Sequence, residues 1–299
     1  MAGKSLSRAL QRMERFRLTP NRHDAGSAGF DLTEEDLIGA LVEKKPPPLL
    51  FERFNEPRIR HDLEVNGILQ KILARGYHDV RVVFDSESFY DSRFRLIARH
   101  PLVDGDCTLI DCLTHRGEVA GESPFTGEAY RLKVLLLEWI NFQDPARPLR
   151  HGTLALPGQT HPGLGVFREA LQVTISYMRE VDMDAVFNVP EYFHNALLYS
   201  SYFRFFSPQR EGRFQAMKRD LLSLGLAESS IFLDEGKVLL DGDPPRPIRW
   251  VPAEQVYPIN PRLEAYFRSD DYLKAVREEM EVTRYRYDPQ ALAHQEQGQ

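Results

Sequence analysis

Residues 152–206 read GTLALPGQTHPGLGVFREALQVTISYMREVDMDAVFNVPEYFHNALLYSSYFRFF, and this stretch decides the fold class. Residues 152–156 are predicted to form a short strand, and a glycine-containing loop follows at 157–165. Apolar residues at helical spacing begin at Phe167. The nearly continuous apolar run at 184–189 is typical of a buried parallel strand. A helix should follow that strand, so the order of elements predicts one βαβ crossover.

Upstream of this stretch the apolar period changes to that of strands. Four strands are predicted, at 80–84, 93–98, 108–113 and 132–142, with turn-like sequences at 104–106 and 115–117. They predict an antiparallel meander beside the crossover. The expected fold class is therefore α+β, a three-layer α/β arrangement with a mixed, mostly antiparallel central sheet. Cys107 and Cys112 are five residues apart, would point to opposite faces of a strand, and are not expected to pair.

The first 23 residues carry six Lys or Arg residues against one acid, Glu14. Leu6, Leu10, Met13 and Phe16 share one helical face, which predicts a basic amphipathic helix. Such a helix could contact an anionic membrane or a partner. The alternative is a terminal helix that packs on the body of the same protein, and we favour this second interpretation.

The chain is expected to divide into an N-terminal helical extension (1–60), a core (61–222) and a C-terminal extension with a disordered tail (223–299). Further elements are predicted from spacing and from Pro and Gly positions: a helix after Thr33, a linker at 44–48, helices at 63–74, 211–222 and 272–281, a hairpin at 231–240, a loop at 243–247, and a disordered segment at 291–299.

The composition excludes several classes of protein. The chain has 299 residues, with 38 Lys and Arg against 44 Asp and Glu, a net charge of −6. This balance argues against a protein that binds polyanions over its whole surface. Two cysteines are too few for a disulfide scaffold or a Cys-rich zinc site. No secretory signal and no apolar run of about 20 residues is seen, so we expect a cytoplasmic, soluble protein.

The loop before Phe167 carries the first candidate site. Gly163 and Gly165 would let a ligand approach the backbone just where a helix begins, and the first helical N–H groups would face a phosphate or pyrophosphate. The loop matches neither the dinucleotide-binding fingerprint nor a Walker loop. The alternative is a simple turn that enters a helix.

The helix expected after Pro190 carries a row of hydrogen-bonding side chains. Tyr192, Asn195, Tyr199 and Tyr202 are three, four and three residues apart and share one face. The alternative is a half-buried aromatic stripe, which is common in globular proteins.

Together these parts resemble the GNAT superfamily of N-acyltransferases. The two glycines of residues 160–165 fit the family's Gln/Arg-x-x-Gly-x-Gly/Ala loop, although Thr160 stands at its Gln/Arg position. Asn195 and Tyr199, followed by residues 203–205, look like its second motif. The resemblance covers about residues 80–220. It places the second strand of a closing hairpin at 211–222, where local spacing predicts a helix, and we follow the resemblance there.

The resemblance implies that acyl-CoA, with an acetyl or longer acyl chain, lies between splayed strands around Leu154 and Val186. The backbone N–H groups of Gly163, Leu164 and Gly165 would hold the pyrophosphate. The residues that it assigns to cofactor binding are Gln159, Thr160, His161, Gly163, Leu164, Gly165, Val166 and Asn195. Tyr199 would be the general acid that protonates the departing thiolate while an amine attacks the thioester directly. No metal is implied.

Glu138 is the candidate base that deprotonates the attacking ammonium. It is a lone carboxylate in the apolar stretch 134–140, where burial would favour its neutral form. The alternative is that Glu138 faces solvent on an alternating strand. His161 and His194 are weaker candidates, because His161 could instead touch phosphate and His194 could cap or line its helix.

No constellation for another enzyme class is found, since Gly-x-Ser-x-Gly and His-Glu-x-x-His are both missing. The basic-aromatic stretches 204–206 and 284–287 could stack on nucleic acid, but in a net acidic chain we interpret them as ordinary surface and expect no nucleic-acid partner. The expected partners are an amine acceptor of unknown identity and, as an alternative donor, an acyl carrier protein. A peripheral membrane contact through residues 1–20 and a homodimer are both compatible with this prediction.

Two other hypotheses stay open. Thr160 and Phe203 depart from the family pattern, so the chain could be a non-catalytic member that binds acyl-CoA or a protein. A scaffold built from the two extensions is the third hypothesis.

Overall fold

The computed structural model describes residues 16–18, 49–85, 91–149, 152 and 154–291. The helix expected after Thr33, the linker at 44–48 and the tail beyond residue 291 lie outside the described residues. So does the predicted N-terminal helix up to residue 15, while its last residue belongs to a strand, β1 (Phe16–Leu18).

Two short helices precede the sheet. In α3 (Glu56–Val65) the Asn55 side chain accepts a hydrogen bond from the Arg58 N–H, a standard N-cap. After α3, Gly67 adopts a left-handed conformation with φ of 76°, and α4 (Ile68–Leu73) begins. The single helix predicted at 63–74 is therefore wrong, because this glycine divides it.

The predicted antiparallel meander is confirmed. It consists of β2 (His78–Asp85), β3 (Asp91–His100), β4 (Val103–Glu122) and β5 (Ala129–Phe142), each paired with the next. The turns predicted at 104–106 and 115–117 are wrong, because both segments lie inside the 20-residue strand β4. Its partners on β3, β5 and β1 satisfy the backbone there.

The βαβ crossover is also present, with a different first strand. It runs from β5 through α5 (Phe167–Glu180) to β6 (Ala185–Asn188), and β6 pairs with β5 in parallel. The strand predicted at 152–156 is wrong: its described residues form no strand, and Leu154 is 52% exposed. Its apolar residues lie in a surface connection between β5 and α5.

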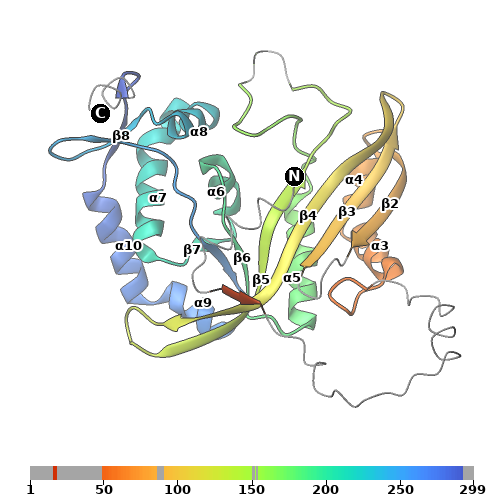
Figure 1. The fold of residues 1–299 in the computed structure, drawn as a ribbon, viewed down its shortest axis with the longest axis horizontal. Helices are drawn as coiled ribbons and strands as arrows, with labels where there is room; N and C mark the ends of the chain where they lie inside the picture. The colour runs from red at the N-terminus through yellow and green to blue at the C-terminus, as the bar shows by residue number, and fades with distance from the viewer. Residues whose placement is uncertain (1–15, 19–48, 86–90, 150–151, 153, 292–299) are drawn as a thin grey trace, which may run out of the picture.

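The C-terminal part completes the sheet with two further strands. Its elements are α6 (Phe193–Tyr199), β7 (Arg204–Phe205), α7 (Pro208–Leu221), the 3₁₀ turn η1 (Leu222–Leu224), α8 (Leu226–Glu235), β8 (Val238–Leu240), β9 (Arg246–Ile248), β10 (Gln255–Pro258), α9 (Pro261–Arg268), α10 (Asp270–Val282) and β11 (Tyr285–Tyr287). The strand order of the main sheet is β2-β3-β4-β5-β6-β10-β7, with β1 added beside β4 (Figure 1).

Two predictions for this part are wrong and one is confirmed. Residues 211–221 belong to helix α7, which Ser207 caps and which begins at Pro208, and residue 222 opens η1. The helix predicted from local spacing is therefore correct, and the strand that the resemblance implied is wrong. The strand that pairs with β7 is β10. The hairpin predicted at 231–240 is instead the end of α8 followed by β8. The helix predicted at 272–281 is α10.

The mixed α+β class, with a mostly antiparallel sheet and one parallel pair, is confirmed. The main sheet takes β10 from the segment assigned to a C-terminal extension, whereas β8, β9 and β11 of that segment form a second, three-stranded sheet. No helix in the described ranges is both long and apolar enough to cross a membrane.

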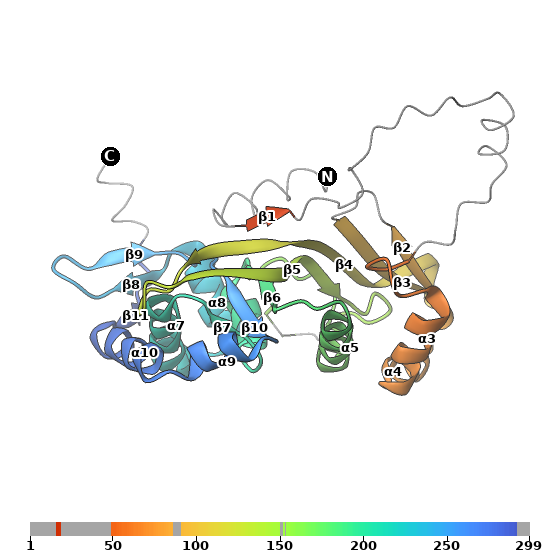
Figure 2. The ribbon, with the colours of Figure 1, turned by 90° about the horizontal axis from the view of Figure 1, so that it is seen from below.

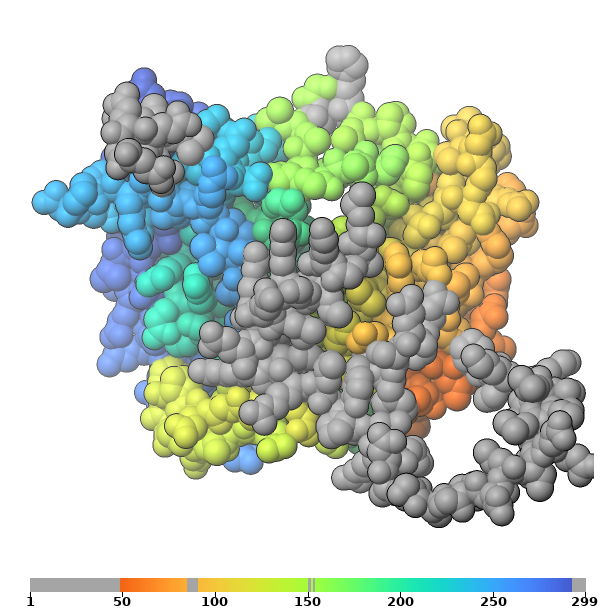
Figure 3. All heavy atoms as spheres, in the orientation of Figure 1, coloured from red at the N-terminus to blue at the C-terminus, as the bar shows by residue number. Residues whose placement is uncertain are grey.

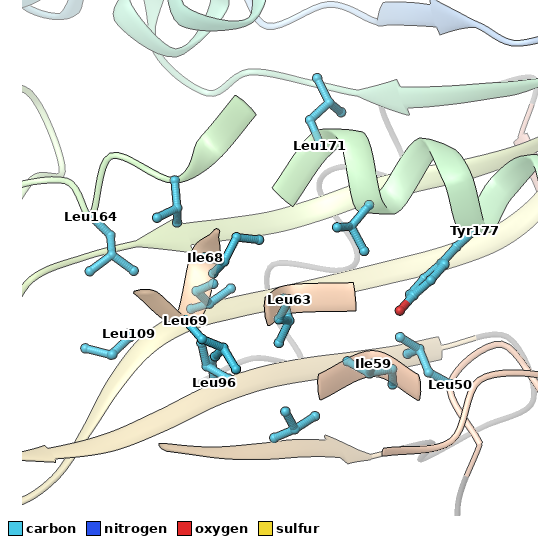
Figure 4. Packing of buried hydrophobic residues seen from close by; sticks show 14 of the residues in the cluster. Leu50, Ile59, Leu63, Ile68, Leu69, Leu96, Leu109, Leu164, Leu171 and Tyr177 are labelled. Carbon is cyan, nitrogen blue, oxygen red and sulfur yellow. The ribbon is translucent and has the colours of Figure 1, made fainter. Parts of the chain in front are cut away.

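Side-chain alternation along β5 divides the core between the two faces of the sheet. Leu135 and Leu137 belong to the larger cluster, against which α3, α4 and α5 pack, whereas Val134 and Leu136 belong to a second cluster with α9 and α10. Figure 2 shows α3, α4 and α5 together on one side of the β2–β5 part. Figure 4 shows Leu63 of α3 and Ile68 and Leu69 of α4 gathered close to Leu96 of β3.

The two cysteines are free, as expected, but they lie on the same face. Cys107 is paired with Ala98 and Cys112 with Phe94, whose side chains share one face of β3. The register of the β3–β4 pair shifts once between these positions, which cancels the alternation expected for a spacing of five.

Helices α7 and α10 approach each other closely at Gly212. A Cβ atom added there would lie 2.6 Å from the Glu279 Cβ and 2.7 Å from the Val276 carbonyl oxygen. Only glycine permits this separation of the two helices, since real Cβ contacts are not this short.

We therefore expect Gly212→Ala to lower the free energy of unfolding by about 1–3 kcal/mol, although alanine favours helices more than glycine does. Urea unfolding followed by circular dichroism measures this. The control is Gln70→Ala on the exposed side of α4, expected to change stability by less than about 0.5 kcal/mol. An unchanged or raised stability of Gly212→Ala would contradict the close packing.

Candidate active site

The parallel strands β5 and β6 pair over four residues and then separate. Val134 to Leu137 pair with Ala185 to Asn188, where β6 ends, whereas β5 continues to Phe142. At the same point the register between β4 and β5 shifts, so that Glu138 has no partner on β4. We call this place the fork. The bulge turns the Glu138 side chain, and the end of β6 leaves the next part of the β5 edge without a strand partner in the described structure.

At the fork, His115 lies between two carboxylates. Its Nε2 contacts Oε2 of Glu138 and its Nδ1 contacts Oδ1 of Asp91. The side chain of His115 is 1% exposed and that of Glu138 is 0% exposed. Burial acts to lower the pKa of His115, but hydrogen bonds to Glu138 and Asp91 outweigh it, so the pKa lies above its ordinary value. An imidazolium that donates to both carboxylates fits this geometry.

The prediction that Glu138 is buried is confirmed, and its second oxygen has no partner. Glu138 Oε1 is buried without a hydrogen bond among the described residues, as are both side-chain amide atoms of Asn188 and Oε1 of Gln255. Asn188 is paired with Leu137 on one side and Gln255 on the other. A buried polar group without a partner costs about 1–3 kcal/mol, so this cluster marks a place where a ligand could supply partners.

Tyr199 approaches the fork from the opposite face of the sheet. It lies in the larger cluster, with its ring centroid 5.1 Å from that of Phe167 and 6.1 Å from that of Phe203. Burial first, and the nearby Cys112 second, raise the pKa of the Tyr199 hydroxyl well above its ordinary value. Within the described residues no hydrogen bond engages this hydroxyl, so Tyr199 is a protonated donor that is free to turn toward a ligand.

The sequence therefore named one residue on each face of the fork. Glu138 points toward His115, and Tyr199 packs against the face that carries Leu137 and Cys112. The two are not in contact with each other, and the end of the parallel pairing lies between them. A molecule placed in the fork would have Tyr199 on one side and Glu138 on the other.

The glycine loop is attached to the end of β5. The Leu164 N–H donates to the Phe142 carbonyl oxygen at 3.2 Å, and the Asp144 N–H donates to the Pro162 carbonyl oxygen at 2.8 Å. The expectation that the Leu164 amide holds a pyrophosphate is therefore wrong, because that donor is already used. The N–H groups of Gly163 and Gly165 have no acceptor among the described residues.

Two cations reach this loop, Lys71 of α4 and Arg75, which follows the end of α4. Lys71 Nζ lies 3.4 Å from the Gly165 carbonyl oxygen and 3.0 Å from Oε1 of Glu169. Gly165 has φ of 65°, and a Cβ added to it would lie 3.4 Å from Nη2 of Arg75. The ion pair with Lys71 is the main cause that lowers the pKa of Glu169. The start of α5 thus combines a helix N-terminus, two cations and one internal carboxylate.

The other residues assigned to the cofactor contribute in different ways. Gln159 closes its own loop, because its side chain accepts from the Leu156 N–H and donates to the His161 carbonyl oxygen. Thr160 is exposed, and His161 is half-buried. Val166 is fully buried in the larger cluster. The side chains of Gln159 and Val166 therefore shape the loop, one bonded within it and the other buried in the core, rather than presenting donors to a ligand at the start of α5.

The row of four residues predicted on one helix face is only partly helical, because α6 holds Asn195 and Tyr199 while Tyr192 is its N-cap and Tyr202 follows its end. Tyr199 is buried, whereas Tyr192, Asn195 and Tyr202 are half-buried. Tyr192 lies against the loop, since a Cβ added to Gly158 would come within 3.0 Å of its ring. Figure 3 shows a hollow between the yellow-green loop and α6.

His194 takes no part in the fork. Its Nδ1 lies 2.8 Å from the Ser230 hydroxyl of α8, and its ring stacks on Tyr192. Burial lowers the pKa of His194 to about 4. It is therefore a neutral residue that lines the helix, one of the two alternatives stated for it.

Sequence reasoning missed the partners that the fold brings together. They are Lys71, Arg75, Asp91, His115, Asn188 and Gln255. One signal was present, because Asn188 is the polar residue inside the apolar run at 184–189. His115 was hidden because it stands beside Arg116 and Gly117, which look like a turn.

No family model matches this chain, and no curated protein matches it.

We expect His115→Asn to lower the free energy of unfolding by about 3–5 kcal/mol, because it leaves two carboxylates without their shared cation. The pKa of His115 is higher in the folded protein than in the unfolded chain. This stabilisation is therefore fully present below the pKa of the unfolded chain, about 6.5, and is lost as the pH rises through the pKa of the folded protein. Urea unfolding at pH 6 and pH 9 measures both effects.

The matched control is His78→Asn. The ion pair of His78 with Asp79 is exposed, 53% and 62% for the two side chains, and is expected to contribute about 0–0.5 kcal/mol. Equal losses in the two histidine variants would show that His115 is not held as described.

His194 makes the opposite pH prediction. Its folded pKa of about 4 lies below the unfolded value of about 6.5, so stability is lost as pH falls between them. From pH 7 to pH 4.5 the wild-type protein should lose about 2 kcal/mol more than His194→Gln, which can still bond Ser230. If the wild type and His194→Gln lose the same free energy of unfolding between pH 7 and pH 4.5, this prediction is wrong.

Proposed function

We propose that the protein is an N-acyltransferase that moves an acyl group from acyl-CoA to an amine. The observation that carries the proposal is the fork, where a short parallel strand pair separates beside unpartnered buried polar atoms and below a glycine loop at a helix start. The resemblance to the GNAT superfamily implies a donor between splayed strands, and β5 and β6 supply them in place of the strand expected around Leu154.

The donor would lie along the free edge of β5. Beyond Leu137 the β5 edge that faced β6 offers unpaired backbone groups, and extended amides pair well with such an edge. The pyrophosphate would reach the N–H groups of Gly163 and Gly165, with Lys71 and Arg75 as counterions. For this, Lys71 would turn from Glu169 toward the ligand.

An apolar cavity of about 90 Å³ lies between the sheet, α3 and α5. Cys112, Leu137, Phe142 and Ala170 contribute to its lining, so it adjoins the face of the fork that carries Tyr199. The apolar lining of this cavity supports an apolar acyl group as the transferred group. The titration below compares an acetyl donor with a long-chain donor.

The chemistry needs one base and one acid. Glu138 Oε1 takes a proton from the ammonium of the acceptor, while the His115 imidazolium and Asp91 hold the Glu138 carboxylate in place. The neutral amine attacks the thioester carbonyl carbon, the C–N bond forms and the C–S bond breaks. The Tyr199 hydroxyl donates its proton to the departing thiolate. The nitrogen of the new amide gives its second proton to the Tyr199 phenolate, and Glu138 releases its proton to solvent, so the amide and the free thiol leave with atoms and protons balanced.

The first experiment is calorimetric titration with acetyl-CoA, a long-chain acyl-CoA and free CoA, followed by thiol release with a panel of primary amines. Tyr199→Phe should lower turnover by about 10²–10⁴-fold with nearly unchanged donor affinity. Tyr202→Phe, a half-buried tyrosine three residues away, is the control and should keep its turnover.

Binding that is lost in a Gly163→Val variant would support the loop as the pyrophosphate site. Donor binding without turnover for any amine tested would favour the non-catalytic alternative. If none of the three CoA compounds binds, the acyl-CoA assignment is wrong.

A further inference from the structure

A second cavity, of about 290 Å³, lies in the C-terminal part of the molecule. It is bounded by α7, by the β8–β9 hairpin and by the segment that follows β9, on the left of Figure 1. It shares no lining residue with the fork or the glycine loop. Its size is at the lower end of small-molecule sites, which span roughly 300–1,000 Å³.

Four arginines line this cavity. Arg210 and Arg213 are three residues apart and share one face of α7. Arg246 is the first residue of β9, and Arg249 is the first residue after β9. Among the described residues that line the cavity, none carries a carboxylate. This concentration of positive charge stands in a chain of net charge −6, so it is a local feature.

Most of this charge is not neutralised within the described structure. Arg213 Nε lies 2.6 Å from Oε1 of Glu279, which is an ion pair. Arg249 donates to the backbone carbonyl of Asp234, which carries no charge. The guanidinium groups of Arg210 and Arg246 have no ion pair or hydrogen bond in the part of the chain that the structure describes.

The inner wall is aromatic and uncharged. Trp250 donates its indole N–H to the Pro190 carbonyl oxygen at 2.9 Å, and its ring centroid lies 6.3 Å from those of Phe205 and Phe214. Burial raises the pKa of Tyr285 to about 12, so its hydroxyl stays neutral. The tryptophan is thus held in one orientation against a fixed apolar wall.

We propose that this cavity binds a small phosphorylated ligand, with its phosphoryl groups on Arg210 and Arg246 and its apolar or aromatic body against Trp250. A guanidinium offers parallel N–H donors that match phosphoryl oxygens, and it forms charge-assisted bonds. The four arginines are exposed around a half-open cavity of limited size, which suits a small anion better than a polymer, since a polymer needs an extended groove. The basic-aromatic stretches that contain Phe205 and Tyr285 were expected to be ordinary surface. Both residues instead line this cavity.

Trp250 makes a direct test feasible, because the chain has only two tryptophans. In a Trp139→Phe background, Trp250 is the single tryptophan and can be excited selectively over the tyrosines. Inorganic pyrophosphate, ATP and adenosine are titrated, with calorimetry as a second readout. We expect saturable binding of pyrophosphate and ATP, no binding of adenosine at the same concentrations, and weakening with salt. Tighter binding of ATP than of pyrophosphate would mean that the body contacts the wall, and equal affinity would mean that the phosphoryl groups alone are recognised.

The double variant Arg210→Ala with Arg246→Ala should raise the Kd of both phosphate compounds at least tenfold, and Arg210→Lys with Arg246→Lys should restore part of the affinity. The charge-matched control is Arg268→Ala with Arg277→Ala, on α9 and α10 outside the cavity, and it should stay within twofold. The fluorescence of Trp250, which lines this cavity, separates this site from the loop of the proposed function.

Three results would overturn the proposal. They are the lack of saturable binding of both phosphate compounds, an affinity in the alanine double variant within twofold of the parent, and an equal loss in the control variant. A 12-nucleotide oligouridylate that binds more than tenfold tighter than ATP would instead identify a nucleic-acid surface.

Discussion

The parallel pairing of β5 with β6 joins the two halves of the sheet, and the rest of the structure depends on it. It spans only four residues. Asp184, just before β6, reinforces its start: one carboxylate oxygen accepts from the Lys133 N–H at 2.7 Å, and the other accepts from the Asn260 side chain at 2.7 Å. One residue thus ties β5, β6 and the end of β10 together. Because the strands are fixed at this end, they are free to part at the other.

The separation of the strands has a cost that the two apolar clusters must offset. The fork holds a buried histidine, two carboxylates and unpartnered amides, where a stable core would place apolar side chains. On both sides of it, the faces of β5 are packed against helices, and each buried apolar side chain contributes about 1.5–3 kcal/mol. Polar groups that weaken a core locally are typical of a site that binds a ligand.

Elements with a strong local pattern could be predicted, and elements that depend on distant partners could not. The apolar run of β6 and the helical spacing of α5 identified the crossover, and helical spacing at 211–222 was a better guide than a resemblance. The strand expected at 152–156 failed because β6 pairs with β5. Tyr199 and Glu138 could be named from sequence, whereas His115 acquires its meaning only from Asp91 and Glu138, 24 and 23 residues away.

The position of β10 between β6 and β7 has a consequence for biosynthesis. A ribosome releases β6 and β7 early, but the strand that must lie between them comes about 50 residues later, after α7, α8 and the β8–β9 hairpin. Until residues 255–258 emerge, the edge of β6 is open and β7 has no neighbour in the sheet. An open edge can pair with another chain. The nascent chain therefore passes through a stage in which this edge is exposed to pairing with other chains.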